Sequence, residues 1–335
     1  MAEAMVGKMP GVQVSQSTGA PGSSLQIKVR GTGTITAGTS PLYVVDGVPL
    51  AQEQLNTFNM NDVESIEVLK DASSAAIYGS RGSNGVVLIT TKRGQEGRAT
   101  VSYNGYYGWQ TVSKKIDMLN AYEYADLVND ARNNTYTDKM ESINRKLIAQ
   151  NKNPLSFDIS DSNAIRLQNT SNDYNTIVPV EILPYLRGEK GLVDTDWQDE
   201  IFQTGFITNN NISITGASAK HSFYLGAGYA YEQGNIKKEK YSKVTLNVSN
   251  DYKVTDNFKV GFQFNGARML PADTKSVATA LRAAPVAHVF NEEYGLYTTL
   301  PGFQKAQMNN PMVDVELKAN TTKAENYRAS GNVYG

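Results

Sequence analysis

The fold is decided by the stretch AIYGSRGSNGVVLITTK, residues 76–92. Asp71 stands at the N-cap position of a helix predicted over Ala72–Tyr78, and Gly79 stands where a glycine commonly follows a helix. Val86–Thr91 is rich in β-branched residues and predicts a strand. The stretch therefore predicts a short helix joined to a strand by a glycine-rich turn.

The glycines of this turn, Gly82 and Gly85, allow two interpretations. Glycine-rich loops can hold phosphate, but such loops follow a strand and open a helix, and here the order is reversed. We therefore interpret the loop as a tight turn between packed elements.

Three more strands are predicted before this turn. They cover Leu25–Arg30, Leu42–Val45 and Val63–Leu69. Asp46-Gly47 directly follows the second of them and is a strong hairpin signal. We expect residues 1–98 to form a compact α+β domain.

The segment Val112–Thr204 is predicted to be a long loop with inserted helices. Asn120 and Glu123 form a capping-box pattern, which predicts a helix to about Arg132. A second helix is predicted over Asp138–Gln150, where apolar residues recur on one face.

From Phe206 onward, apolar residues alternate with small or polar ones, which is the period of strands with two different faces. Val101–Trp109 is a matching earlier strand. Tight turns are predicted at Gly216–Lys220 and Val254–Asn257. The longer segments between strands are Val112–Thr204, Gln233–Tyr241 and Leu270–Thr322. Short turns at one end and long loops at the other are typical of outer-membrane barrels, although a soluble β-sandwich alternates in the same way.

Composition excludes several classes of function. The formal net charge is −1, from 32 Lys+Arg and 33 Asp+Glu, so no basic surface for nucleic acid is expected. The absence of cysteine excludes disulfides, thiolate metal sites and cysteine nucleophiles. No run approaches the roughly 20 apolar residues of a spanning helix, whereas barrel strands need only about 9–11 residues each.

The candidate catalytic and metal-binding residues predict no site. An acidic cluster around Trp197 lacks the spacing of a calcium loop and is interpreted as a solvated loop start. Its members are Asp194, Asp196, Asp199 and Glu200. His221 and His288 have no second ligand at metal spacing, and no nucleophile–base pair can be placed. We predict no metal, no cofactor and no enzymatic activity.

Four motifs resemble the plug domain of TonB-dependent receptors. They are Gly7-Lys8-Met9-Pro10-Gly11-Val12 with Ile27-Lys28-Val29-Arg30-Gly31, then residues 41–49 (PLYVVDGVP), residues 63–72 (VESIEVLKDA) and residues 76–92. In this form the set resembles the SusC/RagA branch, the TonB-linked nutrient importers of Bacteroidetes-type outer membranes. Residues 101–124 and 195–231 also resemble that branch.

The resemblance implies an α+β plug inside a transmembrane antiparallel β-barrel of about 22 strands in the bacterial outer membrane. Residues 99–335 would form the first part of the barrel, with an extracellular loop at about 112–204. The implied function is active uptake of a glycan or a peptide. The implied partners are the TonB complex of the inner membrane, a SusD-like surface lipoprotein and outer-membrane lipid. We expect this chain to be a fragment that cannot import alone, because about six strands leave open edges in lipid.

The resemblance also selects plug residues with a structural or gating role. Arg30 and Arg81 are expected either to pair with carboxylates on later barrel strands or to be surface arginines. The other selected residues are Gly31, Tyr43, Asp46, Gly47, Asp71, Tyr78, Gly79, Gly82 and Gly85.

The alternative function is a soluble or surface-attached carbohydrate-binding β-protein. The two hypotheses differ in where the apolar strand faces point, since an importer turns them outward to lipid and a sandwich buries them. The deciding residues are Phe223, Leu225, Val244, Leu246, Val260 and Phe262.

Overall fold

A computed structural model describes residues 12–16, 19–23, 25–29, 40–50, 55, 58–69, 76–94, 97–272, 277–304, 307–321 and 324–335. The chain divides into two compact units. The first combines Met1–Val112, Gln203–Thr274 and Ala319–Gly335, and it contains the plug and the long strands. The second combines Ser113–Phe202 and Lys275–Lys318.

The plug is built on a four-stranded sheet in the order β4-β3-β6-β5. Its strands are β3 (Leu42–Val45), β4 (Val48–Leu50), β5 (Val63–Leu69) and β6 (Val86–Thr91). β3 and β6 run parallel, and the other neighbours are antiparallel. A separate hairpin pairs β1 (Val12–Gln16) with β2 (Leu25–Val29). The four predicted plug strands are confirmed, although the Arg30 end of the first lies outside the described residues.

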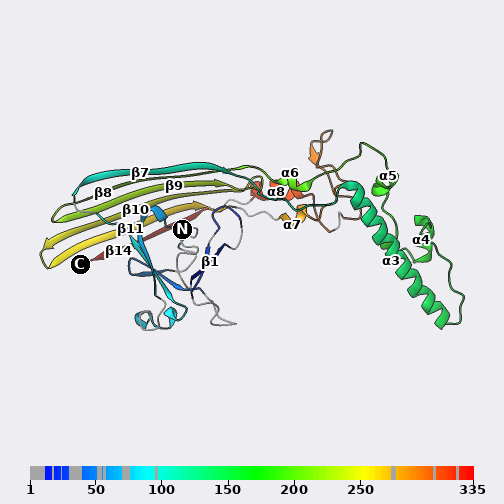
Figure 1. The fold of residues 1–335 in the computed structure, drawn as a ribbon, viewed down its shortest axis with the longest axis horizontal. Coiled ribbons are helices and arrows are strands. Elements are labelled where there is room, and N and C mark those ends of the chain that lie inside the picture. The colour runs from blue at the N-terminus through cyan, green and yellow to red at the C-terminus, as the bar shows by residue number, and fades with distance from the viewer. Residues whose placement is uncertain are drawn as a thin grey trace. The chain divides into compact units, whose positions relative to one another are not determined.

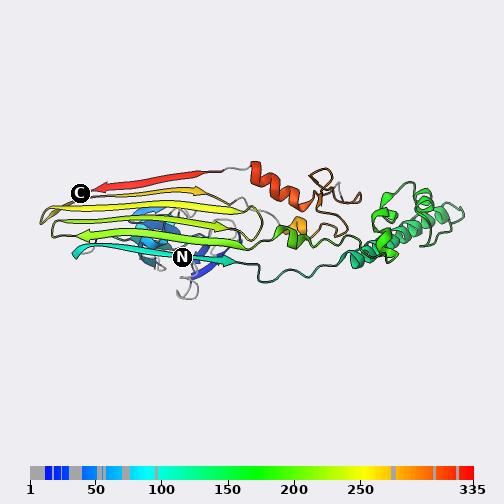
Figure 2. The same cartoon turned by 90° about the horizontal axis from the view of Figure 1, so that it is seen from above.

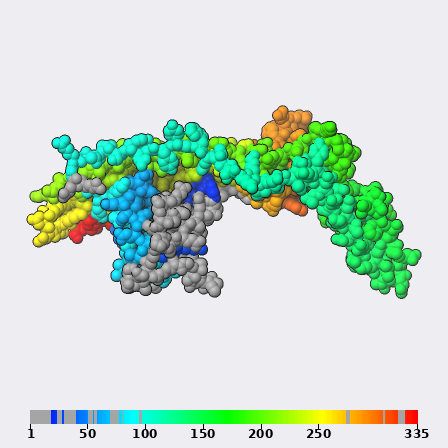
Figure 3. Space-filling model, in the orientation of Figure 1, coloured from blue at the N-terminus to red at the C-terminus, as the bar shows by residue number. Residues whose placement is uncertain are grey.

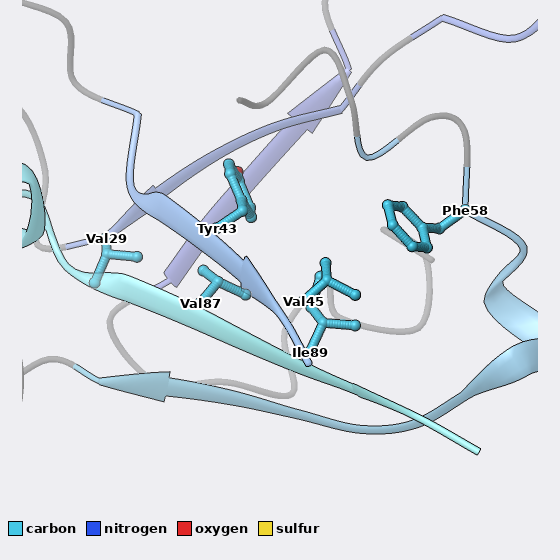
Figure 4. Close-up of a cluster of buried hydrophobic side chains, with 6 residues drawn as sticks. All are labelled: Val29, Tyr43, Val45, Phe58, Val87 and Ile89. Atoms are coloured by element: carbon cyan, nitrogen blue, oxygen red, sulfur yellow. The ribbon is translucent and has the colours of Figure 1, made fainter. Parts of the chain in front are cut away.

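Both faces of the plug sheet carry buried side chains, since Val86 and Val87, neighbours on the central strand β6, are each 1% exposed or less and belong to two different apolar clusters. One face packs against the hairpin and against Phe58, which precedes the short 3-10 turn η2 (Met60–Asp62). Figure 4 shows that cluster, formed by Val29, Tyr43, Val45, Phe58, Val87 and Ile89. The other face is centred on Val44 and Val86, with Tyr78 packed against it.

The helix predicted through Tyr78 is not an α-helix where the structure describes it. Asp71 and residues 72–75 lie outside the described residues, and Ala76–Gly82 forms the 3-10 segment η3. Gly79 interrupts this segment with φ 61° and ψ −151°, a conformation that suits glycine and ends regular helical bonding. The expected glycine turn is therefore present, but it falls inside a 3-10 segment.

The long strands form one antiparallel sheet, called the wall below, in the order β14-β11-β10-β9-β8-β7 (Figures 1 and 2). The strands are β7 (Gly97–Gln110), β8 (Gly205–Ala217), β9 (His221–Gln233), β10 (Lys240–Thr255), β11 (Phe258–Leu270) and β14 (Asn326–Tyr334). Residues 218–220 and 256–257 make tight turns at one end, and residues 111–204, 234–239 and 271–325 connect strands at the other. The predicted asymmetry of the connections is confirmed. The sheet is not closed, since within the described residues β7 pairs only with β8 and β14 only with β11.

The second unit corrects the helix prediction. Instead of two helices, one helix α3 covers Ala121–Ala149. The predicted capping box at Asn120 and Glu123 is confirmed. The helix continues through the predicted gap because no Gly or Pro lies within it. Within the gap, Thr135 Oγ1 donates to the Ala131 carbonyl at 2.7 Å, a bond that threonine makes in helices.

The two long connections fold together in this unit. The further helices are α4 (Asn163–Asn169), η4 (Tyr174–Thr176), η5 (Val180–Ile182), α5 (Leu183–Leu186), α6 (Trp197–Ile201), α7 (Val277–Ala280) and α8 (Pro311–Thr321), with a small hairpin of β12 (Phe290–Asn291) and β13 (Leu296–Tyr297). Trp197 Nε1 donates to the Ala284 carbonyl at 3.0 Å, and the Thr195 amide donates to the Pro285 carbonyl at 2.9 Å. The segment 271–325 is therefore partly helical, a feature that the sequence pattern does not predict.

No helix among the described residues is both long and apolar enough to cross a membrane.

Candidate functional site

The wall has an inverted distribution of polarity. On the face toward the plug, β10 buries Thr245, Asn247 and Ser249, each 5% exposed or less. On the opposite face, Val244 and Leu246 are 48% and 41% exposed. Figure 3 shows the plug, in blue, against one face of the wall. A sandwich would bury the apolar face, so the wall has the polarity of a barrel with a polar interior.

The predicted direction of the apolar faces is confirmed. Leu225, Val244, Leu246 and Phe262 are exposed on the outer face, and Phe223 and Val260 are half-buried by neighbouring side chains on that face. The alternative of a soluble sandwich required these side chains to be covered.

Aromatic rings gather at both ends of the outer face. Trp109 lies 5.9 Å from Tyr107 and 6.1 Å from Phe206 between ring centroids, at the end with long connections. At the end with tight turns, His221 lies 5.7 Å from Phe223. Tyr231, whose ring lies 6.5 Å from that of Phe206, is about 27 Å along β9 from Phe223, at about 3.4 Å per residue. In strands tilted by about 35–45°, this length corresponds to about 19–22 Å along the membrane normal, close to the apolar band about 25 Å tall that aromatic girdles flank.

The plug is held to the middle of the wall by a turn that we call the anchor, Asn59–Asp62. The buried Asp62 carboxylate accepts a hydrogen bond of 2.6 Å from the Tyr224 hydroxyl. The Asn59 amide donates to Asn211 Oδ1, and Lys243 Nζ donates to the Phe58 carbonyl at 3.1 Å. Strands β8 and β9 therefore bond to the anchor, and β10 bonds to Phe58, the residue directly before it.

Burial raises the pKa of the Asp62 carboxyl above its ordinary value. The hydrogen bond from Tyr224 and the charges of Lys92 and Lys243 act in the opposite direction and offset part of this effect. A carboxyl that is only 5% exposed must keep these partners to remain charged.

A second contact lies where the plug leads into β7. Arg93 Nη1 donates to Asp251 at 3.3 Å and to the Tyr334 hydroxyl at 2.5 Å. Lys259 Nζ also pairs with Asp251, at 3.1 Å. Gly94 lies so close to the β8–β9 turn that an added Cβ would be 2.5 Å from the Gly216 carbonyl oxygen. The C-terminal end of the plug is therefore fixed at the end with tight turns.

A third contact involves the loop of the β1–β2 hairpin. The Gly22 amide donates to Glu232 Oε2 at 3.1 Å, and Gly22 packs against the ring of Tyr241. These wall residues lie at the end with long connections, so the described contacts run along the length of the strands.

The residues selected from the sequence mostly stabilise the plug itself. The Asp46 carboxylate accepts bonds from the Thr91 amide at 2.9 Å and the Thr91 hydroxyl at 2.6 Å, which joins β3 to β6 beyond their ladder. Asp46 and Gly47 have positive φ values of 47° and 86°, as the predicted turn requires. Burial raises the pKa of the Tyr43 hydroxyl to about 12.

The glycines and arginines selected from the sequence have different surroundings. Gly85 has φ 93°, and an added Cβ would lie 3.0 Å from Val29, so its turn needs glycine. Gly82 is buried. Arg81 is exposed and forms no ion pair within the part of the chain that is described, so its pairing with later strands remains a prediction. Arg30, Gly31 and Asp71 lie outside the described residues.

Asn59, Asp62 and Arg93 were not selected from the sequence. The available signal was weak: a polar Asn59-Met60-Asn61-Asp62 run directly before a strand, and two glycines, Gly226 and Gly228, on the polar face of β9. Neither pattern indicates its partner, because the partner lies more than 150 positions away in the chain.

The acidic cluster around Trp197 supports the fold of the second unit. Asp194 accepts a bond of 2.8 Å from the Ala121 amide, Asp196 caps α6, and Asp199 pairs with Lys115. Among the described residues no group of acidic or histidine side chains has the arrangement of a metal site.

The second unit also contains an open cavity of about 560 Å³. Exposed aliphatic side chains from Ile116, Met118, Leu119 and Leu127 line it, together with Asp117 and Arg282. These groups offer a contact surface, and they do not form a nucleophile–base arrangement.

Comparison with known proteins agrees with this geometry. Residues 1–86 match the family described as TonB-dependent Receptor Plug Domain. The chain is 30% identical to TonB-dependent receptor P26 of Formosa agariphila, over 98% of this chain and 29% of that protein. It is 30% identical to TonB-dependent receptor SusC of Bacteroides thetaiotaomicron, over 86% of this chain and 25% of that protein. The chain thus spans less than a third of the length of these relatives.

A solved structure shares the fold. The RagAB peptide importer in its closed-closed state superposes with a TM-score of 0.68, at 24% identity, over 93% of this chain and 34% of that one. A folded plug docked on a wall with a polar inner face and an apolar outer face defines the class of plugged outer-membrane barrels.

Within that class, residues 1–86 match the TonB-dependent receptor plug, and the similarity to receptors over most of the chain supports a SusC/RagA-type TonB-dependent receptor. Its location is the bacterial outer membrane. Its relatives are receptors rather than enzymes.

Proposed function

We propose that residues 1–98 are the plug and residues 99–335 the first part of the barrel wall of a receptor for active nutrient uptake. The observation that carries this proposal is the wall itself, since its buried polar face binds the plug while its apolar face is exposed. The driving force would come from the TonB complex of the inner membrane, and the chain would perform no chemistry on its cargo.

The proposed partners follow from the two faces and from the long connections. Outer-membrane lipid would cover the apolar face, and a SusD-like lipoprotein would cover the outer opening of the barrel. The cargo would be a glycan or a peptide. The RagAB complex is a peptide importer, and this chain shares its fold. No nucleic acid is expected, in keeping with the net charge of −1.

The function can be tested with the full-length receptor in a strain that lacks its own copy. Uptake of labelled oligosaccharides and oligopeptides should require both the receptor and TonB. Uptake that persists without TonB would contradict active transport, and a receptor that fractionates with soluble proteins would contradict the membrane wall.

A further inference from the structure

We propose that the open cavity of the second unit binds a short peptide through one of its aliphatic side chains. This inference rests on the proposed function, with the long connections on the outer side, and it selects the peptide from the two cargo classes. The cavity has a volume of about 560 Å³, and every residue that lines it belongs to the second unit. Small-ligand sites commonly have about 300–1,000 Å³, so a short peptide fits a cavity of this size.

Helix α6 holds the two walls of the cavity in place. On one side, Gln198 Nε2 donates to the Ile116 carbonyl at 2.7 Å, and Gln198 Oε1 accepts from the Ile116 amide at 3.0 Å. On the other side, Trp197 Nε1 donates to the Ala284 carbonyl at 3.0 Å. Trp197 and Gln198 are themselves buried, at 3% and 4% exposed. The walls are therefore fixed by buried hydrogen bonds before any ligand arrives, as in a preformed site.

Aliphatic side chains of the lining are exposed to solvent instead of packing in a core. They are Ile116, Met118, Leu119 and Leu127, at 57%, 47%, 45% and 54% exposed. Exposed apolar side chains that gather at one concave place mark a binding surface, because covering them removes apolar area from water. A ligand with an aliphatic side chain would cover them.

The cavity also carries exposed charges of both signs. Asp117 and Arg282 line it, and both are exposed. Two further carboxylates of the lining, Asp194 and Asp196, already accept hydrogen bonds from backbone amides. A free peptide presents an ammonium group and a carboxylate on either side of its side chains, and these groups complement Asp117 and Arg282.

The aromatic rings of the lining explain why a peptide suits the cavity better than a glycan. A sugar ring packs its C–H groups on an open aromatic face, and its hydroxyls need polar partners. The two aromatic residues of the lining are Tyr124 and Trp197, and neither is exposed. The Tyr124 hydroxyl accepts a hydrogen bond from Gln304 Nε2 at 3.1 Å, and the indole N–H of Trp197 is bonded as described above. The exposed part of the cavity is therefore aliphatic and charged.

Titration calorimetry of the purified full-length receptor in detergent tests the apolar part of the proposal. The probe is the tripeptide Ala-Leu-Leu with free termini, and maltotriose is the glycan for comparison. The double variant Ile116→Gln with Leu127→Gln should raise the Kd of the tripeptide by about tenfold or more. Ile148→Gln is the matched control, since Ile148 is also exposed on α3 but does not line the cavity, and its Kd should stay within about twofold of wild type.

Arg282→Gln tests the charged part. This variant should weaken binding of the free tripeptide by about threefold or more and leave binding of its C-terminally amidated form unchanged. A general loss of structure would weaken both forms equally, so the difference between the two forms isolates the contact with the carboxylate.

Three results would overturn the proposal. They are a wild-type receptor that does not bind the tripeptide, a Kd for the tripeptide that the double variant leaves unchanged, and maltotriose binding that the double variant abolishes. If the double variant keeps its affinity for the tripeptide but loses a lipoprotein that copurifies with wild type, the cavity is a protein-docking site instead. Binding in detergent requires neither TonB nor transport. A receptor that binds the tripeptide but imports nothing would therefore contradict the proposed function and leave the peptide site intact.

Discussion

At the residue scale, the contact between plug and wall depends on polar groups that a soluble protein would expose. Asp62, Asn59 and Arg93 are plug residues whose side chains bond to side chains of the wall. Their partners Tyr224, Asn211 and Asp251 lie on β9, β8 and β10. Position on the polar face of the wall, rather than residue type alone, gives these side chains their role.

Asp62→Asn should change how plug docking depends on pH. Because the pKa of Asp62 is raised in the folded receptor, its contribution to docking is fully present below the ordinary aspartate value of about 3.9 and is lost as the pH rises through the raised value. The variant has no such dependence. From acidic to neutral pH, it should therefore gain stability relative to wild type, by up to about 1.4 kcal/mol for each pH unit that separates the folded and unfolded pKa values of Asp62.

Hydrogen exchange of residues 58–69 in the purified full-length receptor measures this effect. Asp256→Asn, in an exposed turn, controls for the loss of one carboxylate. If the variant instead loses protection relative to wild type as the pH rises, the charged form of Asp62 is the stabilising one.

Gly226→Ala should loosen the plug. The new methyl group would overlap Asp62 Oδ1, and overpacking of this kind typically costs about 1–3 kcal/mol. Gly108→Ala is the matched control, since its added Cβ meets no atom closer than 3.7 Å. Limited trypsin digestion should release plug peptides faster from Gly226→Ala than from Gly108→Ala. Equal digestion of the two variants would contradict a steric role for Gly226 in plug docking.

At the element scale, each strand carries two functions on its two faces, and the connections differ between the two ends. The predicted capping box started α3 at the expected residue, and residues outside the helix contact its middle. Arg166, buried beside α3, donates to the Thr176 carbonyl at 3.0 Å and to Asn133 Oδ1 at 2.6 Å, and its guanidinium lies 4.9 Å from the Tyr136 ring.

Arg166→Lys should therefore loosen the middle of α3. Lysine cannot supply the planar fork that reaches several acceptors, and leaving buried acceptors unpaired costs about 1–3 kcal/mol each. Faster hydrogen exchange at residues 131–140 is the expected result. Arg145→Lys, whose ion pair with Glu141 is exposed, should leave exchange unchanged.

The connections predict the orientation of the receptor in the membrane. Residues 218–220 and 256–257 should face the periplasm, and residues 111–204, 234–239 and 271–325 should face outside. Protease added to whole cells should cut within the long segments and spare the tight turns. Cleavage at the tight turns in intact cells would reverse the assignment.

At the scale of the whole molecule, the six-stranded wall has two edge strands, β7 and β14, and each has one described neighbour. An unpaired strand edge in hydrocarbon costs several kcal/mol for each unsatisfied backbone group. Residues 1–335, expressed alone and exported to the periplasm, should therefore not restore growth on the nutrient that the full-length receptor imports. TonB-dependent growth from this chain alone would contradict that expectation.

The sequence by itself determined the local elements and the family of this protein. The strands, the Asp46-Gly47 turn and the capping box depend on residues close together in the chain, and the plug motifs depend on contiguous stretches. Alternation along β9 and β10 also predicted two unlike faces. Only the tertiary structure decided which face is buried, because either face of an alternating strand can be covered. It likewise decided that Asn59 meets Asn211 and Asp62 meets Tyr224, since these contacts join residues 152 and 162 positions apart, and no local pattern indicates such a partner.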